Sequence, residues 1–303
     1  MVLVTAIITT IGTDYLRKAI ESVKSQTYKN IELIVCYDGN NFNDFKEKIE
    51  NEFDNLSLLN VGPFNNANNA RQTGIEQANG EYIALLDDDD YWHEKHIEKN
   101  ICEAKKHQSK NIVLISNSVL IADQKEIRRL PERFFDSSQE SVAEYLFCLK
   151  DNKKTLMQTS SFFFSKEVGI LYNFDRNLTL HQDYDWIIKV DESKEVLIKQ
   201  TGFNTSFYVV DINQNSISKK SKADNSISWA LQSLGSYPKE IVINFFKNNT
   251  LWMMRNENIW DVIKQILKFK KSLGISFLST LPLFFKILIV KVKLCIKKIL
   301  GIA

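Results

Sequence analysis

Short apolar runs alternate with amphipathic segments over the first third of the chain. Val2–Ile8 is continuously apolar and rich in β-branched residues, which is typical of a strand buried on both faces. Asp14–Lys24 instead places its apolar residues on one helical stripe, and Ile31–Cys36 and Glu81–Leu86 repeat the strand pattern. This alternation predicts an α/β fold with a mostly parallel sheet that helices cover on both faces.

Polar segments follow three of these expected strands. Thr9–Thr10, Tyr37–Gly39 and Asp87–Asp90 each stand directly behind an apolar run. Open α/β sheets bind their ligands at the carboxyl ends of the strands. We therefore expect the three segments to meet at one crevice.

The four consecutive aspartates, Asp87–Asp90, are the strongest candidate for a functional site. Adjacent carboxylates repel one another and raise each other's pKa, whereas a bound cation such as Mg²⁺ would turn the repulsion into coordination. The alternative is an acidic, solvated loop in which one aspartate caps the next helix. His93 and His96, one helical turn apart, are a weaker metal candidate because no third ligand stands nearby.

Composition limits the class of protein. The 303 residues include 44% hydrophobic and 25% charged ones, as in ordinary globular domains. The four cysteines are far apart and form no CxxC pair, which argues against structural zinc and disulfides and suits a reducing cytosol. No basic segment precedes the first strand, so we expect no signal peptide.

Beyond residue 92 the pattern continues less regularly and ends in a helical region. We expect helices at Glu94–His107, Gln139–Leu149 and Tyr184–Val190, and strands at Ile112–Ser118 and Ser160–Phe164. From about Asn225 the chain is helical throughout, which predicts an α/β domain at residues 1–220 and a helical region at residues 221–303.

Four segments, taken in order, carry a family likeness. They are Asp14–Tyr28, Tyr37–Asn40, Ala70–Ile75 with Gly80–Ile83, and Leu86–Trp92. The last matches an LDxDDxW signature with its DxD motif, and Tyr37–Asn40 is similar to a DDGS turn. Over about residues 2–220 the chain resembles the family 2 glycosyltransferases, which are inverting enzymes. The resemblance implies the GT-A fold, a Rossmann-like sheet flanked by helices, with a C-terminal helical extension.

The resemblance also implies roles for residues that bind the donor. Thr9 and Asp38 would lie against the nucleotide base, and a carboxylate can accept a hydrogen bond from the uracil imide, which suits a UDP-sugar. Arg71 would sit near the base and the diphosphate, where a guanidinium donates in a fork.

Within the aspartate quartet, the implied roles differ. Asp89 would ligate Mn²⁺ or Mg²⁺ that bridges the two phosphates and neutralises charge on the departing UDP. Asp87 would contact the ribose or the metal shell, and Asp88 would support the nucleotide-sugar site. Asp90 would support the site or cap the following helix.

Inverting transfer also needs a general base, because the acceptor hydroxyl loses its proton as it attacks. The family uses an ED-type motif about a hundred residues after DxD, and the segment His181–Trp186 stands in that place. We assign Asp183 as the base, with Asp185 as the second choice. The alternatives are that Asp183 only caps a helix, or that His181 is the base.

The chain departs from the family pattern at several positions. Tyr37 replaces the first acid of the turn, Gln182 replaces the first acid of the ED motif, and Asn213 stands where the YRxHxxSxS-like segment, here Tyr208–Ser218, has its histidine. Because of Gln182 and Asn213, a non-catalytic membrane-bound scaffold with a degenerate transferase fold is one alternative. A nucleotidyltransferase, which has a related sheet and acidic metal site, is another, although Thr9–Asp14 lacks the glycine-rich basic loop that such enzymes usually carry.

The end of the chain is basic and apolar. Val262–Ala303 contains nine lysines and no acid, which leaves a net charge of −7 in residues 1–261. Apolar runs in Leu281–Ala303 reach only about four residues, far short of the roughly 20 that a spanning helix needs. This composition suits a helix lying on an anionic membrane. The alternative is docking on the α/β domain or on a second subunit.

These patterns define the expected partners. They are a nucleotide-sugar donor, a saccharide or lipid-linked saccharide acceptor and an anionic membrane surface, without nucleic acid; a homo-oligomer is left open. By analogy with the family, the product would be a bacterial capsule or O-antigen polysaccharide. We expect a cytoplasmic protein, peripheral on the inner face of the cell membrane.

Overall fold

The computed structural model describes residues 1–107, 111–210, 223–251 and 253–274. The chain divides into two units, Met1–Gln214 and Asn215–Ala303. The predicted boundary at residue 220, the predicted membrane helix at Leu281–Ala303 and Asn213 all lie outside the described residues.

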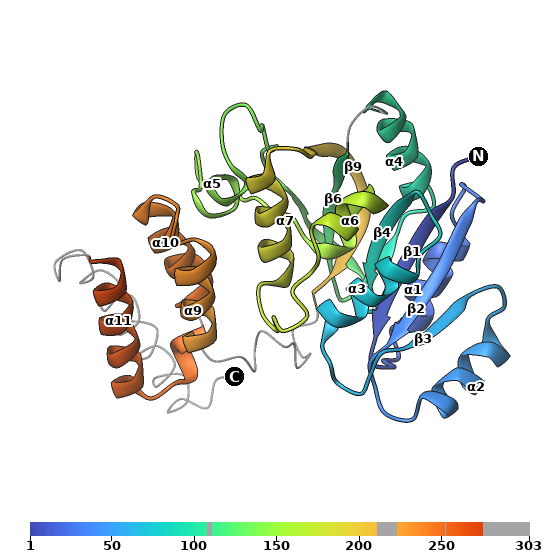
Figure 1. Cartoon of the computed structure of the whole chain (residues 1–303), viewed down its shortest axis with the longest axis horizontal. Coiled ribbons are helices and arrows are strands. Elements are labelled where there is room, and N and C mark those ends of the chain that lie inside the picture. The colour runs from blue at the N-terminus through green and yellow to red at the C-terminus, as the bar shows by residue number, and fades with distance from the viewer. Residues whose placement is uncertain (108–110, 211–222, 252, 275–303) are drawn as a thin grey trace. The chain divides into compact units, whose positions relative to one another are not determined.

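A nine-stranded sheet forms the centre of the first unit (Figure 1). Its strands lie in the order β3-β2-β1-β4-β8-β6-β9-β5, and β7 pairs with β6. The strands are β1 (Val4–Thr10), β2 (Ile31–Tyr37), β3 (Ser57–Asn60), β4 (Tyr82–Asp87), β5 (Tyr91–Trp92), β6 (Ile112–Ala122), β7 (Lys125–Leu130), β8 (Phe162–Ser165) and β9 (Leu197–Val209).

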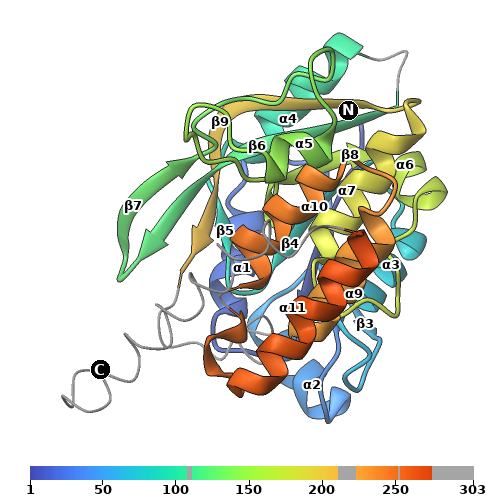
Figure 2. The ribbon, with the colours of Figure 1, turned by 90° about the vertical axis from the view of Figure 1, so that its left-hand side faces the viewer.

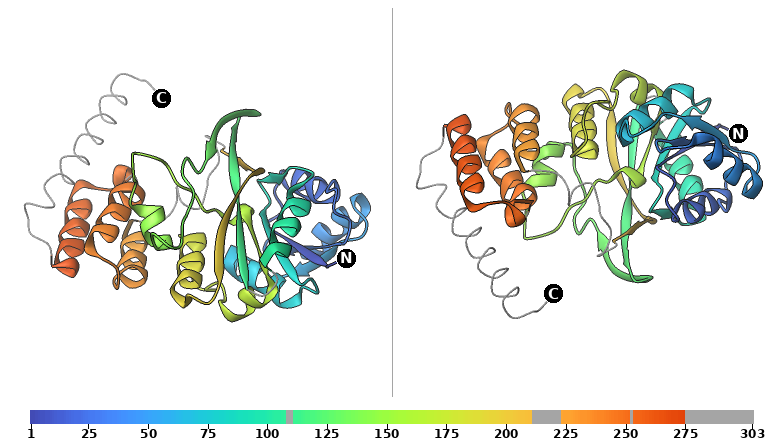
Figure 3. Two further views of the ribbon diagram at one scale, coloured as in Figure 1. Left: turned by 90° about the horizontal axis from the view of Figure 1, so that it is seen from above. Right: turned by 90° about the horizontal axis from the view of Figure 1, so that it is seen from below.

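Helices cover both faces of this sheet (Figure 3). They are α1 (Leu16–Lys24), α2 (Phe42–Glu52), α3 (Ala67–Gln77), α4 (His96–Ala104), α5 (Val142–Phe147), α6 (Lys166–Leu171) and α7 (Gln182–Ser193), with 3-10 turns at Lys105–His107 and Thr159–Ser161. Alternation along β1 decides which helix each residue meets. Val4, Ala6 and Ile8 pack in one core with α1, α2 and α4, whereas Ile7 lies under α3.

The first four strands pair in parallel, as the alternation predicted. β1 lies between β2 and β4, and β3 pairs with β2. Beyond β4 the sheet is mixed, because β8 runs antiparallel to both β4 and β6 while β9 runs parallel to β6. The α/β fold with helices on both faces is therefore confirmed, and its parallel half contains the predicted strand ends.

Two strands of the second half were missed by the sequence prediction. The strand expected at Ile112–Ser118 continues to Ala122 and turns into β7, which projects as a hairpin (Figure 2). β9 was not predicted because several of its buried positions are polar, among them Gln200, Thr205 and Ser206. Apolar periodicity, the main signal for a strand, is therefore weak there.

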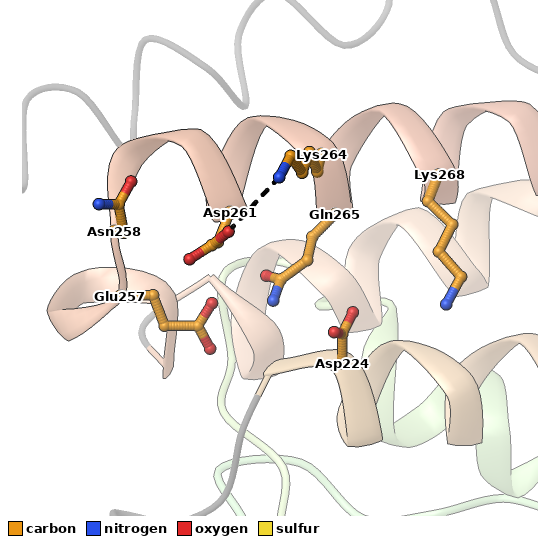
Figure 4. Close-up of a pocket in the computed structure, with 7 residues that line it drawn as sticks. All are labelled: Asp224, Glu257, Asn258, Asp261, Lys264, Gln265 and Lys268. Carbon is orange, nitrogen blue, oxygen red and sulfur yellow. Dashed lines mark ion pairs between the residues drawn. The ribbon is translucent and has the colours of Figure 1, made fainter.

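The described part of the second unit is helical. It contains α9 (Ala223–Ser233), α10 (Lys239–Phe245), a π-helical turn (Phe246–Thr250), a 3-10 turn (Met253–Asn256) and α11 (Ile259–Leu273). Phe246 stacks on Phe269 of α11 with ring centroids 4.3 Å apart. A pocket of about 410 Å³ is lined by Asp224, Glu257, Asn258, Asp261, Lys264, Gln265 and Lys268 (Figure 4).

Gly74 sets how closely α3 approaches the sheet. A Cβ atom at this position would lie 2.7 Å from Cγ2 of Ile7 and 2.9 Å from Sγ of Cys36. Both contacts are shorter than packed atoms tolerate, so α3 fits against β1 and β2 only with glycine here. Arg71 stands one turn earlier on the same helix, and its reach toward the sheet depends on this approach.

We predict that Gly74→Ala lowers the free energy of unfolding by about 1–3 kcal/mol, because overpacking forces neighbouring atoms to move. Urea denaturation measures this loss. Gln77→Ala, an exposed change on the same helix, is the matched control and should leave the midpoint nearly unchanged. Equal midpoints for Gly74→Ala and the parent protein would contradict the close packing described.

Candidate active site

The carboxyl ends of β1, β2 and β4 lie side by side. Thr9 of β1 pairs with Cys36 of β2 on one side and with Asp87 of β4 on the other. The Thr9 hydroxyl lies 3.4 Å from Oδ1 of Asp87. The backbone N–H of Asp38 donates to Thr10 at 2.8 Å. The three polar segments that follow these strands therefore adjoin one another.

Arg71 connects this edge of the sheet to α7. Its Nη2 donates to Oδ1 of Asp87 at 2.7 Å, and its Nη1 donates to Oε1 of Gln182 at 2.9 Å. Nη1 also lies 3.2 Å from Oδ1 of Asn68, one turn earlier on α3. The residue is 5% exposed, and its Nε is buried without a hydrogen-bond partner in the described parts of the chain. The Nε–H donor of the guanidinium is therefore unused.

Asp90 is turned inward and held by three donors. Nε2 of Gln158 donates to it at 2.7 Å, Oγ of Ser160 at 2.6 Å and the backbone N–H of Val209 at 2.9 Å. Burial, with the nearby charges of the same loop, raises its pKa well above the usual range. Asp90 therefore anchors the loop to β9 and to the turn before β8.

The helix-capping alternative for the quartet is wrong. The next helix, α4, begins at His96 and is preceded by Lys95, which makes no side-chain cap hydrogen bond. The aspartates are instead separated from this helix by β5.

Asp88 and Asp89 differ in their partners. Oδ2 of Asp88 accepts hydrogen bonds from the hydroxyls of Thr10 at 2.5 Å and Thr13 at 2.8 Å. Across the described residues, the carboxylate of Asp89 has no side-chain hydrogen-bond partner. Burial and the charges of Asp87 and Asp88 raise the pKa of Asp89 to about 7. Asp89 is thus the acid of the quartet that is left for an external ligand.

A divalent cation fits this donor set in part. Asp87 and Asp89 offer carboxylate oxygens, the ligands that Mg²⁺ and Mn²⁺ take, usually with substrate phosphates and waters completing the shell. Within the described ranges, no group of three or more His, Cys, Asp or Glu side chains could hold a metal. A cation here would therefore depend on the oxygens of a bound diphosphate.

The weaker candidate, a metal site at His93 and His96, is wrong, because both side chains have other partners. His96 is fully buried, stacks on Trp92 at 4.5 Å and bonds Thr205 through Nδ1 at 2.9 Å. Burial lowers its pKa to about 3. Nδ1 of His93 accepts instead from the backbone N–H of Lys95.

Asp38 has a structural role that the sequence did not reveal. Its two carboxylate oxygens accept hydrogen bonds from the backbone N–H groups of Asn65 and Asn66, each at 2.8 Å. Asn66 is the N-cap residue of α3, the helix that carries Arg71. Asp38 therefore fixes the start of α3, while its contact with a nucleobase stays a prediction.

Asp183 lies half-buried in the first turn of α7, where the charge of Asp87 in the quartet acts on it. Its Oδ1 accepts from the backbone N–H of Tyr184 at 2.9 Å, and the N-cap position belongs to His181. Burial raises the pKa of Asp183 to about 6; the charge of Arg71 opposes this shift, and that of Asp87 adds to it. Asp183 is therefore not the N-cap residue.

His181 is less suited to the role of base. Burial lowers the pKa of His181 to about 4, and its ring stacks on that of Tyr184. An imidazole of such low pKa holds a proton weakly at neutral pH. Asp185 is half-buried two residues further along the helix.

Tyr208 is a site residue that sequence reasoning did not single out. Burial raises the pKa of its phenol, and the charges of Asp90, Asp89, Asp183 and Asp87 raise it further. The residue keeps 36% of its surface exposed. A neutral hydroxyl donor therefore faces the acidic groups of both the quartet and α7. The only sequence signal was that Tyr208 is the first residue of the YRxHxxSxS-like segment, Tyr208–Ser218.

The first unit has the arrangement of a GT-A glycosyltransferase fold, with a parallel first half, an acidic loop after the central strand β4 and a second acid on α7. The model of the family "Glycosyl transferase family 2" matches residues 5–166. The chain belongs to this family.

Relatives and solved structures agree with this membership. The amylovoran biosynthesis glycosyltransferase AmsB of Erwinia amylovora is 28% identical over 191 residues, which cover 60% of this chain and 62% of AmsB. The matched region thus spans less than two thirds of that relative. WfaP of Escherichia coli, named a UDP-Glc:alpha-D-GlcNAc-diphosphoundecaprenol beta-1,3-glucosyltransferase, is 38% identical over 81 residues, 26% of this chain and 32% of WfaP.

The fold itself is shared with TarS of S. aureus. The crystal structure of TarS 1–349 in complex with UDP-GlcNAc superposes with a TM-score of 0.65 and 12% sequence identity, over 96% of this chain and 88% of that one. At this identity the likeness establishes the fold alone.

We predict that Asp89→Asn stabilises the metal-free protein at pH 8. The folded-state pKa of Asp89 is raised to about 7, so the parent protein loses stability as pH rises through that value. The variant avoids this loss, on the order of 2 kcal/mol once solvent screening is allowed for. Thermal unfolding between pH 4 and pH 8 measures the difference.

The control for this experiment is Glu47→Gln, which removes an exposed acid. Its midpoint should follow that of the parent protein at every pH. Manganese with UDP should raise the midpoint of the parent protein but not that of Asp89→Asn. A variant that is less stable than the parent at pH 8 would contradict the electrostatic argument.

Proposed function

We propose that this chain is an inverting, metal-dependent glycosyltransferase that transfers a hexose from a UDP-sugar to a saccharide acceptor. The observation that supports this most directly is the Arg71 bridge from Asp87 at the end of β4 to Gln182 at the start of α7. The bridge holds the two acidic segments around one guanidinium, so that a donor and an acceptor bound between them would meet.

The donor half of the site would use the strand ends. Thr9 and Asp38 contact the base, and Arg71, held beside Asp87 at the end of β4, binds the diphosphate. A divalent cation held by Asp89 and Asp87 would neutralise charge on the departing UDP. The TarS complex with UDP-GlcNAc and the UDP-Glc in the name of WfaP both support a UDP-sugar as donor.

The acceptor half would use α7. Asp183 takes the proton of the acceptor hydroxyl. At the same time the acceptor oxygen bonds to the anomeric carbon on the face opposite UDP, and the bond from that carbon to UDP breaks. This displacement inverts the anomeric configuration. With a pKa of about 6, the carboxylate is ionised at neutral pH and is a stronger base than an ordinary aspartate.

The acceptor in this proposal is a lipid-linked saccharide of bacterial surface-polysaccharide synthesis. The names of AmsB, for amylovoran biosynthesis, and of WfaP, for a diphosphoundecaprenol acceptor, support this choice. In the described part of the chain, no helix combines the length and hydropathy that crossing a membrane requires. Peripheral attachment at the cytoplasmic face through Leu281–Ala303 belongs to the proposal.

We predict that Asp89→Ala and Asp183→Asn each lower transfer at least about 100-fold while the protein stays folded. Asp89→Ala should also weaken the binding of UDP with Mn²⁺ in calorimetry, whereas Asp183→Asn should bind it normally. Asp185→Asn is the matched control on α7 and should keep most of its activity. Full activity in Asp89→Ala or Asp183→Asn would remove the role assigned to that residue.

We predict that kcat/KM falls as pH drops through about 6, because Asp183 must be ionised to accept a proton and its pKa is raised to about 6. The loss should approach tenfold per pH unit below that value. Circular dichroism at each pH separates this effect from acid unfolding. A profile that stays level down to pH 4.5 in folded protein would exclude Asp183 as the base.

A further inference from the structure

The outer side of α11 carries an apolar and basic stripe. The helix buries Val262, Gln265, Ile266, Phe269 and Leu273. Trp260, Lys264, Leu267 and Lys271 follow one another at steps of four, three and four residues, and at about 3.6 residues per turn they share the opposite side. We call these four residues the α11 stripe.

The apolar residues of the α11 stripe are unusually exposed. Trp260 leaves 68% of its surface exposed and Leu267 leaves 42%, and the neighbouring Ile259 leaves 38%. The other described tryptophans, Trp92, Trp186 and Trp229, are at most 5% exposed. Large apolar side chains gathered on one exposed face mark an interaction surface.

We propose that the α11 stripe is a docking surface for an anionic lipid membrane, on which the helix lies parallel to the bilayer plane. Tryptophan and leucine beside lysines are the side chains that interfacial helices use, the apolar ones entering the headgroup region and the lysines meeting lipid phosphates. This inference adds a second membrane-binding surface, on residues that the structure describes. It rests on the proposed function only in taking the acceptor to be lipid-linked.

Charge favours a membrane over residues 275–303 and over a second copy of the stripe as the occupant. After Asp261, its only acid, α11 carries Lys264, Lys268, Lys270 and Lys271. Residues 275–303 carry five lysines and no acid, so packing them on the stripe would bring like charges together. A second copy of the chain, meeting the stripe about a two-fold axis, would do the same. Of these three occupants, an anionic lipid surface is the one of opposite charge.

Core contacts hold the inner side of α11 in place, which leaves its outer side available to bind a membrane. Phe269 stacks on Phe246, and Asn258 caps the helix by accepting from the backbone N–H of Trp260 at 2.8 Å. Lys264 lies 4.0 Å from Asp261 and borders the pocket shown in Figure 4. The stripe can therefore enter a headgroup region without removing the core contacts of the helix.

Vesicle co-sedimentation of the full chain tests the proposal. We expect binding to vesicles that contain phosphatidylglycerol and little binding to pure phosphatidylcholine. The double variants Trp260→Ser with Leu267→Ser, and Lys264→Glu with Lys271→Glu, should each lower binding to the anionic vesicles roughly tenfold or more. Thermal unfolding checks that the exposed changes leave the fold intact.

Matched controls lie on the first unit. Ile127 and Phe134 are 55% and 54% exposed, and Ile127→Ser with Phe134→Ser removes as much exposed apolar surface without touching α11. Lys125→Glu with Lys153→Glu repeats the charge change at exposed positions. Both controls should bind vesicles as the parent protein does. Parental binding by both α11 double variants would overturn the proposal and place any membrane contact elsewhere.

Quenching of tryptophan fluorescence by acrylamide gives a second, local readout. Anionic vesicles should protect the parent protein from quenching, and Trp260→Phe should lose that protection while still binding. Protection of Trp260 without vesicles would overturn the proposal, because another part of the chain or a second copy would then cover the stripe. Transfer to a soluble acceptor, measured on the same samples, tests the proposed function separately, since vesicle binding needs no catalysis.

Discussion

The buried guanidinium of Arg71 is the interaction on which the arrangement of the site depends. It ties the end of β4, through Asp87, to the start of α7, through Gln182, and α3 can place it there because Gly74 lets the helix lie close to the sheet. A buried charge is stable only with partners. Removing the guanidinium would leave Asp87 without its ion-pair partner and Gln182 without this hydrogen bond, so the proposed donor and acceptor halves of the site share one support.

Four adjacent aspartates are compatible with a folded loop because each meets a different environment. Asp87 faces Arg71, Asp88 accepts from the hydroxyls of Thr10 and Thr13, and Asp90 points inward to Gln158 and Ser160. Hydrogen bonds and one ion pair thus offset part of the repulsion in three of the four. The remaining repulsion acts on Asp89, whose raised pKa expresses a preference for a proton or a cation.

Sequence reasoning found the parts of the fold and site that local patterns encode. Continuous apolar runs revealed β1, β2 and β4, and the rule that ligands bind at strand ends brought Asp38 and Asp87 to one edge. The residues that hold the site in place were not visible, because their contacts join distant parts of the chain. Ser160 supports Asp90 from 70 residues away, and Gln182 meets Arg71 across 111 residues. No spacing or periodicity in one sequence encodes such pairs.

The glutamine at position 182 has a physical consequence for the charge of the site. An acid there would give Arg71 a second carboxylate and would add a negative charge beside Asp183. The neutral amide accepts the same hydrogen bond from Nη1 at 2.9 Å and leaves Asp87 as the only ion-pair partner of the guanidinium in the described ranges. Arg71 then keeps more of its attraction for an anionic ligand such as a diphosphate. The glutamine at this position is therefore no argument for a degenerate site, because it preserves the bridge to α7 and lowers the competition for the buried Arg71.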